Sequence, residues 1–349
     1  MHMMRVIVAG LLALGVTAFS GCGKGNDANA GGGGGGGGTR LSVYLLPKTK
    51  GNPYFESCAK GAQEAADKLN ISLTYDGPTS SSSNQAEDAA KMIETWTLKG
   101  AGVIAVSASN AGIQAPAMEA AQKKGIKVIT FDADTGPGSR SLFVCQASAE
   151  DIGNGLADAL AADIAGGDAT KAEGEVAIVT GHATAANQNE WIKYITARLA
   201  AKYPNLKLVD TQPSDDDPNK AQSVTQALIQ SKPNLKGIFA ISSQAFPAAA
   251  EAIKQAGKSG KIQITGLATP DGMRNYVKDG TVKSVVLWDT VDLGYLTVYV
   301  ADAVATGKYK AGDTSIDAGR LGKKEIKGDM VMLGKMLIFN KDNIDQYHF

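Results

Sequence analysis

The hydrophobic pattern from Leu41 onward alternates short apolar runs with longer segments whose apolar positions recur every three or four residues. Several of the short runs, such as 103–106, contain no polar residue, which is typical of strands covered on both faces. The pattern predicts strands at 41–46, 71–75, 102–106, 127–131, 175–180, 207–211, 237–241, 261–266 and 282–288. It predicts helices at 52–69, 86–98, 113–124, 150–164, 187–202, 220–230, 246–256, 272–279 and 293–306.

Regular alternation of strands and helices predicts right-handed βαβ units and parallel sheets. The rhythm stops after Gln146 and starts again, which divides the strands into two groups. A chain of 349 residues is also too long for one compact core. We therefore expect an α/β fold of two doubly wound parallel-sheet lobes joined by a hinge. Ligands of such sheets bind beyond the carboxyl ends of the strands, so polar residues just after strands are candidates for a site.

The first 22 residues have the pattern of an export signal. Arg5 precedes an uncharged apolar run at 6–19, which is too short to span a bilayer, and Cys22 follows two small residues. The sequence Phe19-Ser20-Gly21-Cys22 resembles a bacterial lipobox, in which the cysteine is lipidated, although leucine is usual at the position of Phe19. The alternative is an ordinary signal peptide in which Cys22 is incidental.

Residues 23–39 contain eight consecutive glycines, at 31–38. Such a tract buries no apolar area and is expected to act as a flexible tether. It also matches a Gly-x-Gly-x-x-Gly pattern, but no strand precedes it, so it predicts no phosphate site. We expect the chain to contact a membrane through its lipid anchor only.

The composition argues against several classes of function. Lys and Arg together number 35, as do Asp and Glu, so no basic surface for nucleic acid is expected. The sequence has no Ser/His/Asp arrangement, Cys/His metal spacing or Walker loop, so we expect no enzyme, metal or cofactor. Cys58 and Cys145 are expected to be separate buried thiols, and the acidic run 215–217 to form a turn and a helix start.

Candidate binding residues follow two strands in the first half of the chain. Lys48 could donate to a ligand hydroxyl, Tyr54 and Phe55 could form an aromatic wall, and Asp132 could accept from two vicinal hydroxyls. Asp134 is a further candidate. The alternatives are a solvated lysine, aromatics that pack a helix, and a carboxylate of Asp132 that caps a turn. For Asp134 a structural role is favoured over ligand binding.

The second half offers a matching set after its own strands. The amides of Asn187 and Gln188 both donate and accept, which suits hydroxyl recognition, although Asn187 could instead cap a helix. Trp288 could stack on a sugar ring. The remaining candidates are Ser243, Gln244 and Asp289. The alternatives for the last strand end are a core tryptophan and a helix-capping Asp289.

Several segments together resemble the type I periplasmic binding proteins of sugar ABC transporters, and within them the branch of the autoinducer-2-binding and rhamnose-binding proteins. The segments are Leu46-Pro47-Lys48, 75–79, 130–135, 187–191, 245–250, 269–274, Leu287-Trp288-Asp289 and 338–344. The resemblance implies an N-terminal lobe of 40–146 plus 289–320 and a C-terminal lobe of 147–288 plus 321–349. It also implies hinge crossings near Ala147, Asp289 and residue 320, closure around a ligand, and docking on a permease. We expect a monomer in the periplasm or cell envelope.

The resemblance also bears on the ligand. The autoinducer-2 (AI-2) binders contact their ligand through residues that match Lys48, Asp132 and Gln188, but have aspartate at Asn187, and proline and alanine at Ile241 and Ser243. These differences favour a monosaccharide, such as the deoxyhexose rhamnose, over AI-2. Two further hypotheses compete with an importer component. One is a sugar sensor of the same fold that is not coupled to transport, and the second is a sugar-processing enzyme that uses two carboxylates as acid and base.

Overall fold

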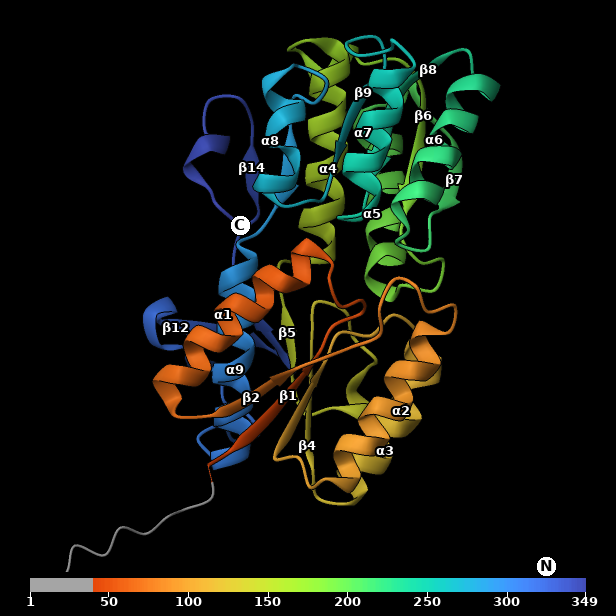
Figure 1. Ribbon diagram of the computed structural model, residues 1–349. Helices are drawn as coiled ribbons and strands as arrows, with labels where there is room; N and C mark the ends of the chain where they lie inside the picture. The colour runs from red at the N-terminus through yellow and green to blue at the C-terminus, as the bar shows by residue number, and fades with distance from the viewer. Residues whose placement is uncertain (1–39) are drawn as a thin grey trace, which may run out of the picture. The chain divides into compact units, whose positions relative to one another are not determined.

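The computed structural model describes residues 40–349, which form two α/β lobes (Figure 1). The expected signal peptide 1–22, its lipidation site Cys22 and the tether 23–39 lie outside the described residues. The predicted fold class of two doubly wound lobes is confirmed, and the predicted helices and strands are present with ends shifted by a few residues. None of the helices within 40–349 is both long and apolar enough to cross a bilayer.

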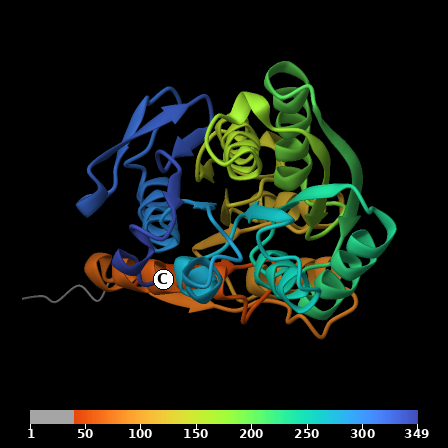
Figure 2. The same cartoon turned by 90° about the horizontal axis from the view of Figure 1, so that it is seen from above.

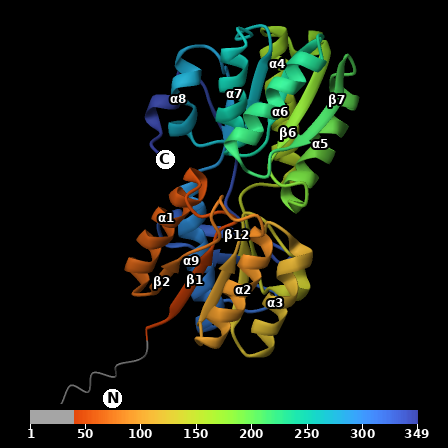
Figure 3. The same ribbon diagram turned by 45° about the vertical axis from the view of Figure 1, so that its right-hand side comes forward.

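The first lobe is built on an eight-stranded sheet in the order β11-β12-β13-β5-β4-β3-β1-β2. Strands β1 to β5 and β13 run parallel, whereas β11, β12 and β13 are joined antiparallel. Helices α1 and α9 pack side by side on one face, and α2 and α3 cover the other (Figure 3). The strands are β1 (Ser42–Leu46), β2 (Ser72–Tyr75), β3 (Val103–Val106), β4 (Lys127–Phe131), β5 (Phe143–Cys145), β11 (Ser315–Asp317), β12 (Lys323–Lys327) and β13 (Met330–Met332). The helices are α1 (Pro53–Leu69), α2 (Gln85–Leu98), α3 (Ala111–Lys123) and α9 (Thr290–Thr306).

The second lobe has a four-stranded parallel sheet in the order β7-β6-β8-β9. Helices α4 and α5 lie on one side of it, and α6, α7 and α8 lie on the other (Figure 2). A short antiparallel pair, β10 with β14, adjoins β9 through a bridge from Leu267 to Val286. The strands are β6 (Gly174–Thr180), β7 (Leu206–Pro213), β8 (Leu235–Ala240), β9 (Gln263–Gly266), β10 (Val285–Leu287) and β14 (Leu337–Phe339). The helices are α4 (Ala149–Ala165), α5 (Ala186–Lys202), α6 (Pro218–Ser231), α7 (Ala245–Gln255) and α8 (Pro270–Lys278).

Three helices begin with the same local signal, a polar cap followed by proline. Asn52, Asp217 and Thr269 each accept a hydrogen bond from a backbone N–H of the first helical turn, and a proline follows each of them. Proline suits this position because its fixed φ is helical and its missing N–H would have no partner there. Ser148 also caps α4, by accepting from the N–H of Asp151, although no proline follows it. These caps fix where each helix starts relative to the strand before it.

The strand pairing corrects one predicted boundary. Residues 321–349 were assigned to the C-terminal lobe, but β12 and β13 within this range pair with the sheet of the first lobe through β5. Only β14 reaches the second lobe, where it pairs with β10. The last crossing therefore lies between β13 and β14 rather than near residue 320. The other two passages between the sheets lie between β5 and α4 and between β10 and α9.

A partly buried carboxyl on α4 gives the second lobe an expected pH dependence. Asp163 accepts from Ser284 Oγ at 2.6 Å, and burial raises its pKa to about 6. A carboxyl whose pKa is raised by folding stabilises the protein at low pH and loses that contribution as the pH rises through about 6. We expect Asp163→Asn to stabilise the protein above pH 7 by about 1–3 kcal/mol, because the charged form is no longer buried. Urea unfolding at pH 5 and pH 8 measures this, and an equal effect at both pH values would contradict it.

Candidate functional site

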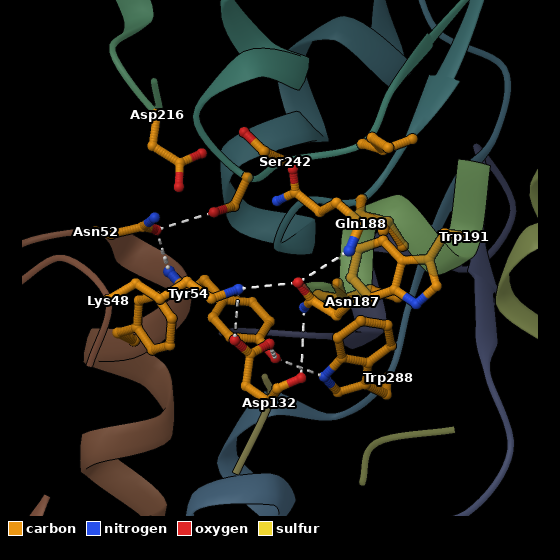
Figure 4. Close-up of a pocket in the computed structure, with 15 residues that line it drawn as sticks. Lys48, Asn52, Tyr54, Asp132, Asn187, Gln188, Trp191, Asp216, Ser242 and Trp288 are labelled. Carbon is orange, nitrogen blue, oxygen red and sulfur yellow. Dashed lines mark hydrogen bonds and ion pairs between the residues drawn. The ribbon is translucent and has the colours of Figure 1, made fainter. Parts of the chain in front are cut away.

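A cavity lies between the two lobes, at the carboxyl ends of strands from both sheets (Figure 4). Its polar lining comes from the loops after β1, β4, β7 and β8 and from the first turn of α5. The cavity has a volume of about 40 Å³. The residues that line it are Lys48, Asn52, Tyr54, Phe55, Asp132, Asn187, Gln188, Trp191, Asp216, Ile241, Ser242, Ser243, Leu267, Leu287 and Trp288.

Asp132 is the centre of the first lobe's contribution. It follows β4 with a φ of 61°, a left-handed conformation that asparagine and aspartate tolerate better than most residues. Its carboxylate accepts from Tyr54 OH at 2.9 Å and from Ser107 Oγ at 2.6 Å, and it pairs with Lys48 Nζ at 3.1 Å. Three donors therefore hold the carboxylate in one orientation at the edge of the cavity.

The charges of this cluster are buried and compensated. The side chains of Lys48 and Asp132 are only 4% and 5% exposed. An isolated charge at such a depth would be costly, and the ion pair with its additional hydrogen bonds offsets that cost. Burial and the nearby Asp132 carboxylate raise the pKa of Tyr54 well above its ordinary value, so the phenol stays neutral and donates. Trp288 Nε1 in turn donates to Tyr54 OH at 3.0 Å.

Aromatic side chains form one wall of the cavity. Tyr54 lies edge-to-face with Phe55 and with Trp288, at centroid distances of 5.0 and 6.0 Å. Trp191 from α5 meets Trp288 at 6.1 Å, so the wall includes residues of both lobes. Such a wall supplies the apolar contact that the carbon faces of a ring-shaped ligand need.

The second lobe contributes amides at the start of α5. Lys48 Nζ donates to Asn187 Oδ1 at 3.2 Å, and Asn187 Nδ2 donates to the backbone oxygen of Asp132 at 3.4 Å. Gln188 Oε1 accepts from the N–H of Gly181 at 2.8 Å and from the hydroxyl of Thr180. Because its oxygen has two donors, Gln188 is left with its Nε2 group as a donor for a ligand.

Direct hydrogen bonds join the two lobes at the cavity and beside it. Besides the contacts of Asn187, Ser243 Oγ donates to Asn52 Oδ1 at 3.0 Å, and Thr184 Oγ1 donates to the Ser109 carbonyl at 3.3 Å. A cavity of about 40 Å³ is far below the roughly 300 Å³ at which small-molecule pockets begin. The structure is therefore closed, and the lobes must move apart to admit a ligand larger than a few waters.

Three of the candidate residues do not line the cavity. Arg140 and Thr130 hold the carboxylate of Asp134, at distances of 2.6 to 2.8 Å. Burial would raise the pKa of Asp134, but these hydrogen bonds and the Arg140 charge outweigh burial and lower it. Asp289 caps α9 by accepting from the N–H of Asp292 at 2.9 Å, and Gln244 lies at the start of α7. Asp134 and Asp289 therefore have structural roles, which were the alternatives to ligand binding for these two residues.

Several residues of the site did not appear among the candidates. Ser107 is the first residue after the fully apolar strand β3, so the rule that ligands lie beyond strand ends should have included it. Asn52 had a signal in its position as a helix cap before proline. Asp216 was assigned to a turn with the rest of its acidic run. The others are Trp191, Ile241, Ser242, Leu267 and Leu287.

The structure also bears on metal and thiol chemistry. Over residues 40–349, no three His, Cys, Asp or Glu side chains are placed to hold a metal ion. Cys58 and Cys145 are both buried free thiols, as predicted. Burial raises the pKa of Cys145 to about 12, so this thiol is not a reactive thiolate at neutral pH.

Comparison with known proteins agrees with the fold. The model of the periplasmic binding protein domain family matches residues 43–309. The chain belongs to this family. The family members that resemble this chain bind solutes. This periplasmic binding protein is therefore a solute-binding protein and not an enzyme.

Three similar proteins illustrate the relationship. The ribose import binding protein of Salmonella typhimurium is 28% identical over 76% of this chain and 86% of its own length. LsrB from Clostridium saccharobutylicum, solved in complex with AI-2, is 28% identical with a TM-score of 0.84 over 88% of this chain and all of its own. An ABC transporter solute-binding protein from Clostridium phytofermentas with bound L-rhamnose is 28% identical with a TM-score of 0.80, over 88% and 98% of the two chains. The expected resemblance to sugar-binding and AI-2-binding members is confirmed.

Proposed function

We propose that this periplasmic binding protein captures a monosaccharide between its lobes and delivers it to the permease of an ABC importer. The observation that carries the proposal is the cavity itself. At the carboxyl ends of two parallel sheets it combines a buried carboxylate and lysine, several amides and an aromatic wall. Hydroxyl groups that both donate and accept, carried on a ring with apolar faces, complement this lining.

The contacts of Asn187 favour a sugar over AI-2. Asn187 accepts from Lys48 and donates to the backbone oxygen of Asp132, so it needs both halves of an amide. An aspartate at this position could not donate, and its charge would compete with Asp132 for Lys48. Ser243 adds a hydroxyl that contacts Asn52. The relatives with bound or imported sugars include binders of ribose and L-rhamnose, and a deoxyhexose such as rhamnose is our first candidate.

AI-2 is the second candidate ligand. Lys48, Asp132 and Gln188 all line the cavity, and these positions match the ligand contacts of the AI-2 binders. The similar fold of LsrB with bound AI-2 supports the same comparison. We therefore include AI-2 among the ligands to be tested.

Export and membrane attachment complete the proposal. The N-terminal pattern supports cleavage of the signal peptide before Cys22, lipidation of Cys22 as the new N-terminus, and attachment in the periplasm or cell envelope through the tether 23–39. Opening and closing of the lobes, the hinge motion for which periplasmic binding proteins are a known example, would let the permease distinguish loaded from empty protein. Growth on the identified sugar after deletion of the gene for this protein distinguishes the two roles. Loss of growth indicates transport, and unchanged growth indicates sensing.

Thermal melts of residues 40–349 with pentoses, hexoses, deoxyhexoses and AI-2 test the ligand class. A ligand at about 1,000 times its dissociation constant should stabilise the protein by about 4 kcal/mol, which raises the melting temperature by several degrees. We expect such a shift with one or a few monosaccharides. A shift with AI-2 alone would contradict the preference for a sugar, and no shift with any of these ligands would contradict the proposal as a whole.

A further inference from the structure

A second carboxylate, that of Asp216, faces the cavity from the other lobe. Asp216 lies in the turn between β7 and α6, and in Figure 4 it lies on the opposite side of the cavity from Asp132. It has a φ of 53°, and Asp215 before it has a φ of 54°. Two consecutive residues in this left-handed conformation are uncommon outside glycine, and strained backbone gathers at functional sites.

The surroundings of the Asp216 carboxylate differ from those of Asp132. The residue is 5% exposed, yet its Oδ1 has no hydrogen-bond partner within residues 40–349. His182 Nε2 lies 3.5 Å from the other oxygen, Oδ2, and makes no hydrogen bond within the same range. A buried carboxylate oxygen without a donor is costly. Such a group persists where a ligand supplies the missing hydrogen bond.

In the acidic run 215–217, the structural contacts are made by Asp215 and Asp217, the neighbours of Asp216. Asp217 caps α6 by accepting from the N–H of Lys220 at 2.9 Å, and Asp215 pairs with the Lys220 side chain. The space for the carboxylate is provided by Gly181, where an added Cβ would lie 2.4 Å from Asp216 Oδ1. The helix cap and the surface ion pair therefore do not require an acid at position 216.

We infer that Asp216 Oδ1 is a second hydrogen-bond acceptor for the ligand. It selects sugars that carry a hydroxyl donor on the side of the ring opposite the hydroxyl that Asp132 holds. This inference rests on the proposed sugar-binding function. Among the described residues that line the cavity, Lys48 is the only Lys, Arg or His side chain, and it is paired with Asp132, so a carboxylate on the ligand would meet Asp216 without a free cation from the lining. The site therefore accepts neutral sugars and rejects the corresponding uronic acids.

Isothermal titration of residues 40–349 with the sugar that gives the largest melting shift tests the inference. Asp216→Asn keeps the size and the left-handed turn but removes the charge, and we expect it to weaken binding about 10- to 100-fold. Asp215→Asn is the matched control, because it makes the same change one residue away and outside the cavity. We expect it to alter affinity by less than about twofold. Equal effects of the two substitutions would overturn the inference.

Melting of the ligand-free variants provides a readout that needs no ligand. If the Asp216 carboxylate is kept for binding, its removal should leave the melting temperature unchanged or raised. A melting temperature several degrees below that of Asp215→Asn would show a structural role and overturn the inference. If no sugar shifts the wild-type protein, the proposed function fails, and this comparison still decides whether the carboxylate is structural.

Discussion

Asp132→Asn should weaken sugar binding by at least about a hundredfold and destabilise the ligand-free protein by about 3–5 kcal/mol, because it leaves the buried Lys48 without its countercharge. The substitution preserves the left-handed backbone, since asparagine tolerates a φ of 61°. It also replaces the charged carboxylate, which accepts hydrogen bonds from Tyr54 and Ser107, by a neutral amide. Isothermal titration and urea unfolding of residues 40–349 measure the two effects separately.

The double variant Lys48→Met/Asp132→Asn separates stability from recognition. Removing both charges should recover much of the lost stability, because no uncompensated ion remains, whereas affinity should stay low. Glu325→Gln breaks an exposed ion pair with Lys327 and serves as a control, with an expected effect below about 1 kcal/mol. Unchanged affinity in Asp132→Asn would remove this residue from the site. Recovery of affinity in the double variant would show that Lys48 and Asp132 only stabilise the fold.

The strand-end rule explains both the successes and the failures in predicting the site. It placed Lys48, Asp132, Asn187 and Ser243 at the cavity because the sequence pattern already locates the ends of long apolar strands. The rule does not predict the direction of a side chain, because that direction depends on the conformation of the loop after the strand. Asp134 is turned away by Arg140, which is six residues further along the chain. Asp216 is turned inward by a left-handed backbone and the space at Gly181, and neither is visible in a hydrophobic pattern.

The fold itself was predictable where segments are long and periodic. The nine long helices expected from 52–306 form, because each has an apolar face that repeats over several turns. The strands that were missed are short: β5, β11, β13 and β14 have three residues each, and β12 has five. Their pairing depends on partners far away in sequence, as when β13 joins β5. The boundary near residue 320 was therefore wrong, since only tertiary pairing determines which sheet a three-residue strand joins.

The packing of α1 against α9 connects the fold to the site. Gly294 on α9 lies so close to α1 that an added Cβ would be 1.7 Å from the Cys58 carbonyl oxygen. On α1, a Cβ at Gly61 would be 1.8 Å from the carbonyl oxygen of Val291. Both obstructions are backbone atoms, which cannot rotate away as a side chain can. The two helices can approach this closely only because each presents a glycine to the other.

Gly294→Ala should therefore destabilise the protein by about 3 kcal/mol or more, because the helices must separate to admit the methyl group. Gly155→Ala on α4 is the matched control, since its Cβ would meet only the flexible end of Met336 and alanine favours the helix. We expect the control to stay within about 1 kcal/mol of wild type. If urea unfolding gave the same result for both variants, the close approach of α1 and α9 would be wrong.

Gly294→Ala should also weaken sugar binding, although Gly294 does not line the cavity. Tyr54 is near the start of α1 and Trp288 precedes α9, and the 3.0 Å hydrogen bond between them depends on the spacing of the two helices. Separation of the helices would shift Tyr54 relative to both Trp288 and Asp132, so the aromatic wall and the principal carboxylate would lose their alignment together. Titration of Gly294→Ala below its melting temperature measures this effect. Wild-type affinity in a destabilised Gly294→Ala would show that the site does not depend on the helix pair.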